Sequence, residues 1–428
     1  MNPPKLRVLV SFIGKGQRDG SSSGYRTTQY TFPDGWQSPE LSVFGIALLT
    51  YYEAHLRRSI DKWLVLGSPQ SNWDALLEAV PDQLRDDALS RRHETVRTAV
   101  KAEEDSSSAS GIGQLTQPLL DAWSDALSER LHPMAVKCQL VGWCEAHESQ
   151  LQMWRVLSQE VPEGSELVLD ITHGFRHQPT LLAPMVVLLG MLKNLSGVEL
   201  YYGALDMDRR VLKLDLFPEL LRYIQHLSLL QTSGDYEPLG KALIEASLCD
   251  QLAQIAFVER TNRPINPNRV HKLLAQAQRM LPSDHPLKCD LFNSMRTHMQ
   301  KHLQPSHWER LCARADEAAE HKDYVVAYTL LYEATVAFAV HQKYPNPQEA
   351  MLDPSCRAHA FGELCHRDTT GVLKTLRNVR NTIVHASQPP DGATQQALQS
   401  EAELQAFYKK ASQTVRGLVG EQSESSRP

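Results

Sequence analysis

Residues 166–179 read ELVLDITHGFRHQP, and this stretch decides the fold of the N-terminal half of the chain. Its first six residues, ELVLDI, are mostly apolar and predict a short strand. The next six residues, THGFRH, form a turn, and Pro179 suits the first turn of an apolar helix that runs to about Lys193. A strand followed directly by a helix is the repeating unit of a mainly parallel α/β sheet.

The same alternation extends in both directions from this stretch. Residues 6–13 (LRVLVSFI) have the apolar, β-branched pattern of a strand that is buried on both faces. Further strands are expected at 25–32, 62–66, 134–142, 198–204 and 210–216, and helices at 39–58, 114–131 and 145–160. We therefore predict an α/β domain over residues 1–217, with helices on both faces of its sheet.

The pattern changes after residue 217, and we predict helices but no further strand. The helices are expected at about 219–233, 238–258, 267–281, 286–303, 307–320, 323–344, 371–387 and 392–418. The fold class is thus a multidomain α/β plus all-α protein. The sheet domain at 1–217 is followed by a helical linker region at 218–305, a helical domain at 306–420 and a disordered tail at 421–428.

Composition limits the class of protein. The net charge of −6 argues against a protein that coats nucleic acid through its whole-molecule field, although a nuclease needs only a local basic pocket. The seven cysteines form no CxxC pair and no zinc-binding spacing, which favours reduced thiols in a cytoplasm and no bound metal. The longest apolar stretch, residues 181–192, is too short to span a bilayer, so no membrane contact is expected.

The most specific motif is RNVRNTIVHA at residues 377–386. On a helix, Arg377, Asn381 and His385 share the face opposite an apolar stripe, and Arg380 lies on the flank. These side chains suit RNA cleavage without a metal, because histidine moves protons at neutral pH and arginine stabilises the charge that builds up on phosphate. The alternative is a solvated helix face that carries these residue types by chance. The asparagine directly after Arg380 and the opposing apolar stripe favour the active-site interpretation.

This motif resembles the R-x4-6-H motif of HEPN ribonucleases, in which asparagine often follows the arginine. The resemblance implies a helical bundle that pairs into a homodimer, with a composite active site formed by Arg380, Asn381 and His385. Arg377, one turn earlier, either helps to bind RNA or has a surface role. Residues 323–344 resemble the long core helix of that fold, in which Glu333 either supports the site or is an exposed charge.

A second motif, Asp170 to Arg176, lies at the junction between the strand and the helix quoted first. A glycine in such a turn lets the backbone approach a ligand closely, and the start of the following helix favours anions. Thr172 and His173 add donors, and Arg176 adds charge. A capped helix start with an incidental histidine is an equally good interpretation of this motif alone.

A third motif, Ser11 to Gln17 (SFIGKGQ), follows the first strand. It is neither a dinucleotide fingerprint nor a Walker loop, because the glycine spacing is wrong and a predicted strand follows. Its value is its position, since the carboxyl ends of parallel strands meet at one edge of a sheet.

Together these two loops resemble those of the CARF domain, a CRISPR-associated Rossmann-like fold whose dimer binds cyclic oligoadenylate. The resemblance spans essentially the whole chain, with sensor first and helical effector second. It assigns ligand contacts to Ser11, Gly14, Lys15, Gly16 and Gln17 on one loop and to Thr172, His173, Gly174, Phe175 and Arg176 on the other. The resemblance implies that backbone amides take phosphates and that Lys15 and Arg176 supply charge.

The resemblance implies a type III CRISPR accessory endoribonuclease in a prokaryotic cytoplasm. It would need no cofactor, with cyclic oligoadenylate as allosteric activator and cyclic tetra-adenylate as the favoured ring size. The substrate would be single-stranded RNA and not DNA, because the attacking 2′-OH is absent from DNA. Products would carry 2′,3′-cyclic phosphate ends.

Two other functions remain open on the sequence. The first is a non-catalytic nucleotide-sensing regulator whose helical half only dimerises or binds a partner. The second is a HEPN ribonuclease toxin that is gated by a protein partner. Cleavage of the bound ring by the sensor domain itself, assisted by His173 or Lys15, is a further activity that the residues do not assign.

Overall fold

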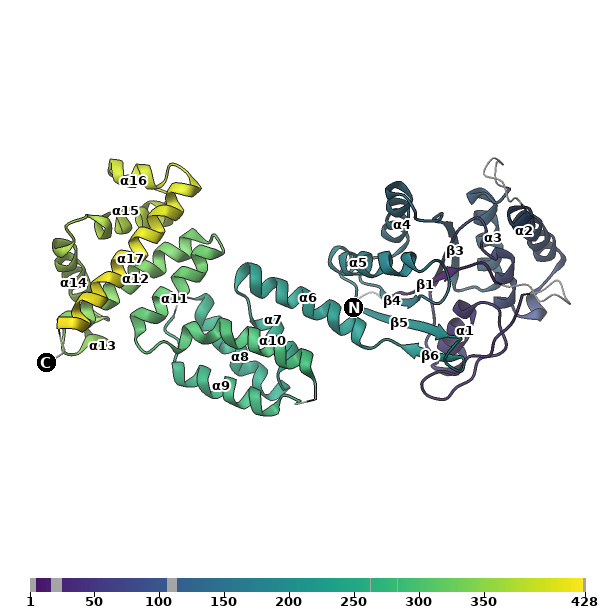
Figure 1. The fold of residues 1–428 in the computed structure, drawn as a ribbon, viewed down its shortest axis with the longest axis horizontal. Coiled ribbons are helices and arrows are strands. Elements are labelled where there is room, and N and C mark those ends of the chain that lie inside the picture. Colours follow the sequence, from purple (N-terminus) through teal and green to yellow (C-terminus); the bar gives the residue numbers. More distant parts are fainter. Residues whose placement is uncertain (1–4, 17–24, 106–113, 262, 283, 426–428) are drawn as a thin grey trace. The chain divides into compact units, whose positions relative to one another are not determined.

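The computed structural model describes residues 5–16, 25–105, 114–261, 263–282 and 284–425 (Figure 1). The chain divides into two compact units, Met1–Arg222 and Tyr223–Pro428. The first is α/β and the second is helical, so the expected order of the two fold classes is confirmed. The division lies inside a helix, a few residues after the expected boundary at 217.

The first unit contains a six-stranded sheet with the order β3-β2-β1-β4-β5-β6. Neighbouring strands from β3 to β5 are parallel, and β6 runs antiparallel to β5. This is the strand order of doubly wound nucleotide-binding sheets. The strands are β1 (Arg7–Ile13), β2 (Lys62–Gly67), β3 (Ala135–Leu140), β4 (Glu166–Asp170), β5 (Gly197–Ala204) and β6 (Arg210–Lys213).

Helices cover both faces of this sheet because alternate residues of the central strand are apolar on both sides. Leu9 and Ile13 of β1 belong to one buried core, and Val8 and Phe12 to the other. The first core also includes residues of α1 (Phe44–Thr50), α2 (Asp87–Asp105) and α3 (Gln117–Arg130). The second includes residues of α4 (His147–Glu160) and α5 (His177–Leu192). Shorter helical turns span Tyr51–His55, Trp73–Ala79 and Asp82–Leu84.

Two expectations for this unit were wrong, and one helix was not predicted. Residues 25–32 form only isolated bridges, because Thr31 meets the edge of β6 while Tyr30 and Phe32 turn inward to the core. The helix expected at 39–58 is shorter, with α1 followed by a π-helical turn. The sequence pattern also missed α2, whose many charged residues obscure its apolar face.

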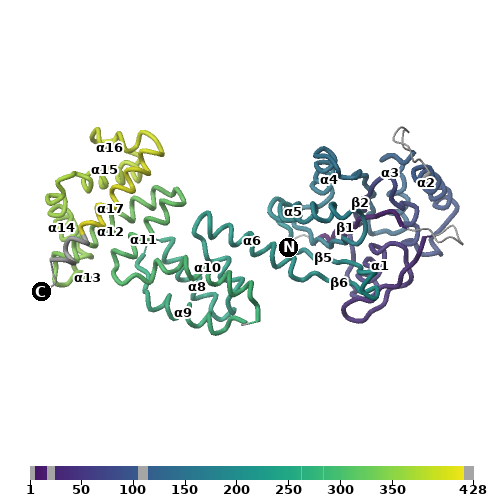
Figure 2. Tube along the Cα trace, viewed as in Figure 1, coloured from purple at the N-terminus to yellow at the C-terminus, as the bar shows by residue number. Residues whose placement is uncertain are grey.

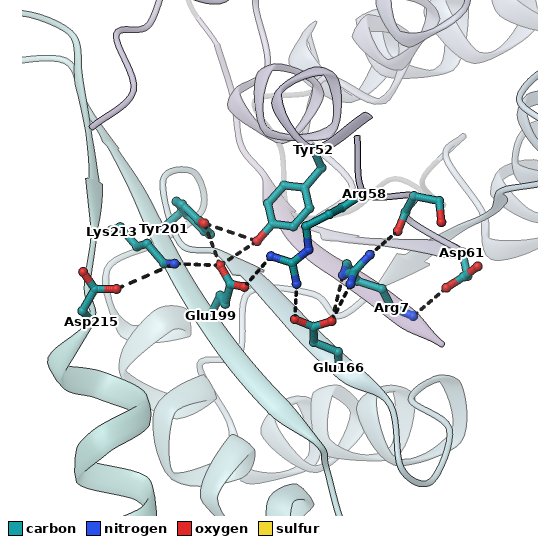
Figure 3. Close-up of polar contacts among 10 residues, drawn as sticks. Arg7, Tyr52, Arg58, Asp61, Glu166, Glu199, Tyr201, Lys213 and Asp215 are labelled. Carbon is teal, nitrogen blue, oxygen red and sulfur yellow. Dashed lines mark hydrogen bonds and ion pairs between the residues drawn. The ribbon is translucent and has the colours of Figure 1, made fainter. Parts of the chain in front are cut away.

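A charged network ties β5 and β6 to the segment after α1 (Figure 3). The carboxylate of Glu199 accepts hydrogen bonds from Tyr201 at 2.7 Å and Tyr52 at 2.8 Å, and it pairs with Lys213 at 3.0 Å and Arg58 at 3.1 Å. Burial alone would raise the pKa of Glu199, but the bonds from Tyr201, Lys213 and Tyr52 lower it to about 2. The network continues through Arg7, Asp61, Glu166 and Asp215.

The second unit has two apolar cores rather than one. The first is built from α6 (Leu216–Ser233), α7 (Glu237–Leu243), α8 (Ala246–Arg260), α9 (Pro267–Met280), α10 (Pro286–Met299) and the turn Gln300–Leu303. The region expected to be a linker at 218–305 therefore has a hydrophobic core of its own.

The second core of this unit is built around α12 (Tyr324–Lys343), which packs against α11, α14 and α15 (Figure 2). The other helices are α11 (His307–Glu320), α13 (Pro347–Ala350), α14 (Pro354–Arg367), α15 (Val372–His385), α16 (Gly392–Ala397) and α17 (Glu401–Ser425). Neither α13 nor α14 was predicted. α17 extends five residues into the expected disordered tail, and residues 426–428 lie outside the described part.

α12 is, within the described residues, the one helix long and apolar enough to cross a bilayer by length and composition. About 61% of its apolar window is buried inside the second unit. A helix in the core of a globular unit has the same length and apolar composition.

Candidate functional site

The two glycine loops predicted from the sequence leave the sheet at one point. β1 and β4 are neighbours, and the chain continues from β1 toward β2 and from β4 toward β5, in opposite directions across the sheet. The carboxyl ends of β1 and β4 therefore form the topological switch point, where open α/β sheets bind ligands. Gly14 follows one strand and Ile171 the other.

A pocket of about 400 Å³ lies at this switch point. This volume is within the range of small-molecule sites. The walls come from the carboxyl ends of β1, β2 and β4 and from the loop after β3. They comprise Ile13, Gly14, Lys15, Ser68, Gln70, Ser71, Trp143, Thr172, His173, Gly174, Phe175 and Gln178.

The pocket contains six of the ten predicted ligand-binding residues: Gly14, Lys15, Thr172, His173, Gly174 and Phe175. Ser11 is fully buried beneath it, where its Oγ accepts a hydrogen bond from Trp63 Nε1 at 2.9 Å. Ser11 is thus a core residue rather than a lining residue. Gly16 and Arg176 do not line the pocket, and Gln17 lies outside the described residues.

The two loops touch through their glycines. A Cβ atom placed on Gly14 would lie 3.1 Å from the backbone nitrogen of Gly174. Gly174 has a φ of +91°, a conformation that L side chains rarely adopt. Both positions therefore need glycine for the loops to approach each other this closely.

His173 contributes no positive charge to the pocket. Its half-buried ring accepts a hydrogen bond at Nε2 from the backbone N–H of Phe44, at 3.1 Å, so the proton of the neutral ring lies on Nδ1. Burial lowers the pKa of His173 to about 4. The predicted donor role therefore passes to Nδ1, while Nε2 fixes the ring against the start of α1.

The backbone amides of the second loop divide into two kinds. The Thr172 amide donates to Asp170 Oδ1 at 2.8 Å, and the Phe175 amide donates to Gln178 Oε1 at 3.0 Å. Within the described residues, the amides of His173 and Gly174 have no hydrogen-bond partner. These two amides of the second loop remain available to an anion, whereas the Thr172 amide is already bonded to Asp170.

A buried carboxyl group supports this loop from below. Asp170 is fully buried, and its Oδ2 atom has no hydrogen-bond partner within the described residues. Burial raises the pKa of Asp170 to about 7, although the hydrogen bonds from Thr172 oppose the change. Asp170 therefore changes charge near neutral pH.

Besides Ile13, the last residue of β1, five of the lining residues were not predicted. Ser68, Gln70 and Ser71 follow β2, Trp143 follows β3, and Gln178 lies in the first turn of α5. All but Gln178 stand after strands that end at the same edge of the sheet, which is the signal that would have found them.

The second candidate site lies on α15 in the helical unit. The residues Val372, Leu373, Leu376 and Val379 are buried in the core of this unit. Arg377, Arg380 and Asn381 are half-buried, and His385 is exposed as the last residue of the helix. The predicted apolar and polar faces are thus both present.

Two contacts hold the side chain of Arg380 on α15. Its Nη1 donates to Asn381 Oδ1 at 2.9 Å, and its guanidinium lies over the ring of Tyr332 at 5.4 Å from the centroid. Its Nε atom is buried without a hydrogen-bond partner within the described residues. The remaining N–H groups are the kind that bind phosphate oxygens.

The other predicted residues make different contacts. Arg377 lies over the ring of Phe361, and Glu333 forms an ion pair with Arg357 at 2.5 Å. Glu333 therefore joins α12 to α14, and within the described residues it forms no ion pair with Arg380. Within the described residues, Arg380 and Asn381 bond to each other, and His385 forms no hydrogen bond or ion pair with either of them.

Neither candidate site is arranged as a metal site. Among the described residues, no group of three or more histidine, cysteine, aspartate or glutamate side chains could hold a metal ion.

The fold and the two sites define a two-unit protein, with a candidate anion pocket at a sheet switch point and a candidate phosphate-binding helix in the helical unit. The chain is similar to CRISPR-associated protein MJ1674 of Methanocaldococcus jannaschii, at 24% identity over 423 aligned residues. The similarity covers 90% of this chain, and therefore both units, but only 63% of the relative. No family model matches the chain. The comparison supports the CRISPR-associated part of the resemblance that the motifs suggested.

Proposed function

We propose that this chain is a metal-independent endoribonuclease of CRISPR antiviral defence, activated by cyclic oligoadenylate at the switch-point pocket. The observation that carries the proposal is the meeting of the Gly14 and Gly174 loops at the carboxyl ends of β1 and β4, which leaves two adjacent amides for a phosphate. The similarity to a CRISPR-associated protein supports it.

The pocket suits an anionic ligand for three reasons. The amides of His173 and Gly174 are ready donors, and Lys15 adds a cation to the opposite loop. α5 begins at His177, directly after the second loop, and the start of a 16-residue helix favours anions. A ring of phosphates would thus meet donors from both loops.

The helical unit suits cleavage of RNA by its own 2′-OH. Arg380 is held by Asn381 and Tyr332, so its remaining N–H groups are oriented to stabilise the phosphate while its charge increases. His385 is exposed and free to move a proton to or from the reacting oxygens. In this step the 2′ oxygen bonds to phosphorus, the 5′ oxygen leaves with a proton, and the product ends in a 2′,3′-cyclic phosphate.

The activator would act by shifting a conformational equilibrium. A ligand that binds one arrangement of the sensor units more tightly than the other increases the population of that arrangement. We propose that paired chains then place two Arg380–Asn381 pairs and two His385 rings around one RNA strand. The homodimer is part of this proposal.

The test is cleavage of a fluorescent single-stranded RNA in EDTA, with no ligand and with cyclic tri-, tetra- and hexa-adenylate. Wild type should cleave only with one ring size, and His385→Ala should reduce the rate by about 100-fold or more. The matched control is His366→Ala, which removes an exposed histidine in the last turn of α14 and should leave the rate unchanged.

Each other outcome is informative. Cleavage without ligand would keep the nuclease and remove the proposed control. No cleavage with any ring would contradict the nuclease and favour a non-catalytic sensor, the second candidate function. The observation that keeps that candidate open is that, within the described residues, His385 forms no bond with the Arg380–Asn381 pair.

A further inference from the structure

An aromatic surface, of which the motifs predicted only Phe175, lies at the rim of the switch-point pocket. It consists of Trp143 from the segment between β3 and α4, Phe175 from the second glycine loop, and His177 at the start of α5. The Trp143 and Phe175 rings are 4.9 Å apart, and the Phe175 and His177 rings are 5.8 Å apart and nearly parallel. We call these three residues the aromatic platform.

The platform is exposed in spite of its apolar character. Trp143 is 38% exposed and Phe175 is 41% exposed. Large apolar rings that face solvent beside a polar pocket commonly mark a binding surface, because their burial by a partner is favourable.

Hydrogen bonds hold the platform in place before any ligand arrives. Nε2 of His177 donates to the Trp143 carbonyl oxygen at 2.6 Å, because a carbonyl can only accept. The buried Gln178 donates to the Gly142 carbonyl at 3.2 Å and accepts from the Phe175 amide at 3.0 Å. The first turn of α5 thus anchors both the segment between β3 and α4 and the second glycine loop. Because these segments are already held, little conformational entropy is lost when a ligand binds.

We infer that the aromatic platform binds a nucleobase by stacking, so that the pocket selects ligands in which a purine is joined to a phosphate. The inference deepens the proposed function and rests on it for the identity of the ligand. Phe175 adjoins the free amides of His173 and Gly174, and all of them line one pocket with Trp143. A phosphate at the amides therefore has its base within reach of the rings.

The platform explains how the pocket would reject simple anions. Inorganic phosphate or a sugar phosphate would use the amides and Lys15 but would leave Trp143 and Phe175 in water. Stacking of one base on an aromatic ring changes affinity by about tenfold to a hundredfold. Trp143 would be the main determinant, because indole offers the largest ring surface.

The experiment measures calorimetric binding to the full chain. The proteins are wild type, Trp143→Ala, Trp143→Phe and the control Leu151→Ala, which truncates an apolar side chain on α4 that is 46% exposed. The probes are cyclic tetra-adenylate, adenosine 5′-monophosphate and ribose 5-phosphate. We expect Trp143→Ala to weaken binding of both adenine compounds about tenfold to a hundredfold and to leave ribose 5-phosphate unchanged. Trp143→Phe should recover most of the loss, and Leu151→Ala should match wild type.

The outcomes separate the platform from the proposed function. If wild type binds cyclic tetra-adenylate and Trp143→Ala binds it equally well, the platform inference is wrong and the activator stands. If wild type binds no ring but prefers adenosine 5′-monophosphate over ribose 5-phosphate through Trp143, the platform stands and the activator is wrong. If Trp143→Ala changes only the oligomeric state in light scattering, a second copy covers the rings and the inference is overturned.

Discussion

Gly174 offers the sharpest test of the geometry at the switch point. The change is Gly174→Ala, which adds one methyl group where the second loop turns with a φ of +91°. The methyl would lie 2.7 Å from Gln178 Oε1 and 3.2 Å from the Cβ atom of Phe12. Phe12 is fully buried in the core, so Gln178 has to move.

The cost follows from two separate contributions. An L side chain at this φ costs about 1–2 kcal/mol. Movement of Gln178 breaks its bond with the Phe175 amide and weakens its bond with the Gly142 carbonyl, at about 1 kcal/mol for each. We therefore expect Gly174→Ala to reduce the free energy of unfolding by about 3–4 kcal/mol.

The measurement is urea unfolding followed by tryptophan fluorescence. Only Trp308 of the seven tryptophans lies beyond Arg222, so the signal reports mainly the first unit. The control is Gly164→Ala, because Gly164 has a φ of +71° but nothing within 4 Å of the added Cβ. It should cost only about 1 kcal/mol, through backbone strain. If Gly174→Ala costs no more than this control, the close contact with Gln178 does not constrain the loop and the reasoning fails.

Two further predictions concern pH. Because burial raises the pKa of Asp170 from 3.8 to about 7, its contribution to stability is present below about pH 4 and is lost as the pH rises through 7. Asp170→Asn should therefore become more stable than wild type by up to about 4 kcal/mol at pH 8, and a constant difference across pH 4–8 would contradict the assignment. The pKa of Glu199 is lowered to about 2 by its hydrogen bonds, so its contribution is present above about pH 4.5 and is lost as the pH falls toward 2. Glu199→Gln should reduce the free energy of unfolding by about 1–3 kcal/mol at pH 7, and urea unfolding should show this difference vanish as the pH falls toward 2. A difference that stays the same in acid would contradict the role given to the Glu199 network.

The elements that the sequence predicted best have strong local patterns. β1, β2 and β4 are short apolar runs with clear ends, and α11 begins directly after Ser306, whose side chain caps the helix. Residues 25–32 alternate like a strand, but a strand needs a partner along its whole length, and here only single residues such as Thr28 and Thr31 reach one. Local pattern cannot show whether a partner edge is available.

Sequence predicted those residues of the site that the backbone conformation requires to be glycine. It missed the properties that depend on contacts between residues far apart in the chain. Gly14 and Gly174 were found because a tight turn after a strand needs glycine. The neutral state of His173 could not be predicted, because the ring nitrogen is occupied by the Phe44 amide, which is 129 residues away in the sequence. A histidine next to a glycine was counted as a donor to anions, whereas one of its nitrogens is already an acceptor.

Trp143 shows the same limit most clearly. Its strand, β3, lies three positions from β4 in the sheet, and neighbouring strands are about 4.8 Å apart, so strand order alone would place Trp143 roughly 14 Å from the second loop. The contact with Phe175 arises because α4 packs beside α5 on the same face, which draws the segment between β3 and α4 across the end of the sheet. Hydrogen bonds from His177 and Gln178 then fix it there. A residue enters this pocket through the packing of the helix that follows it, so every loop at the carboxyl edge has to be considered, including those after distant strands.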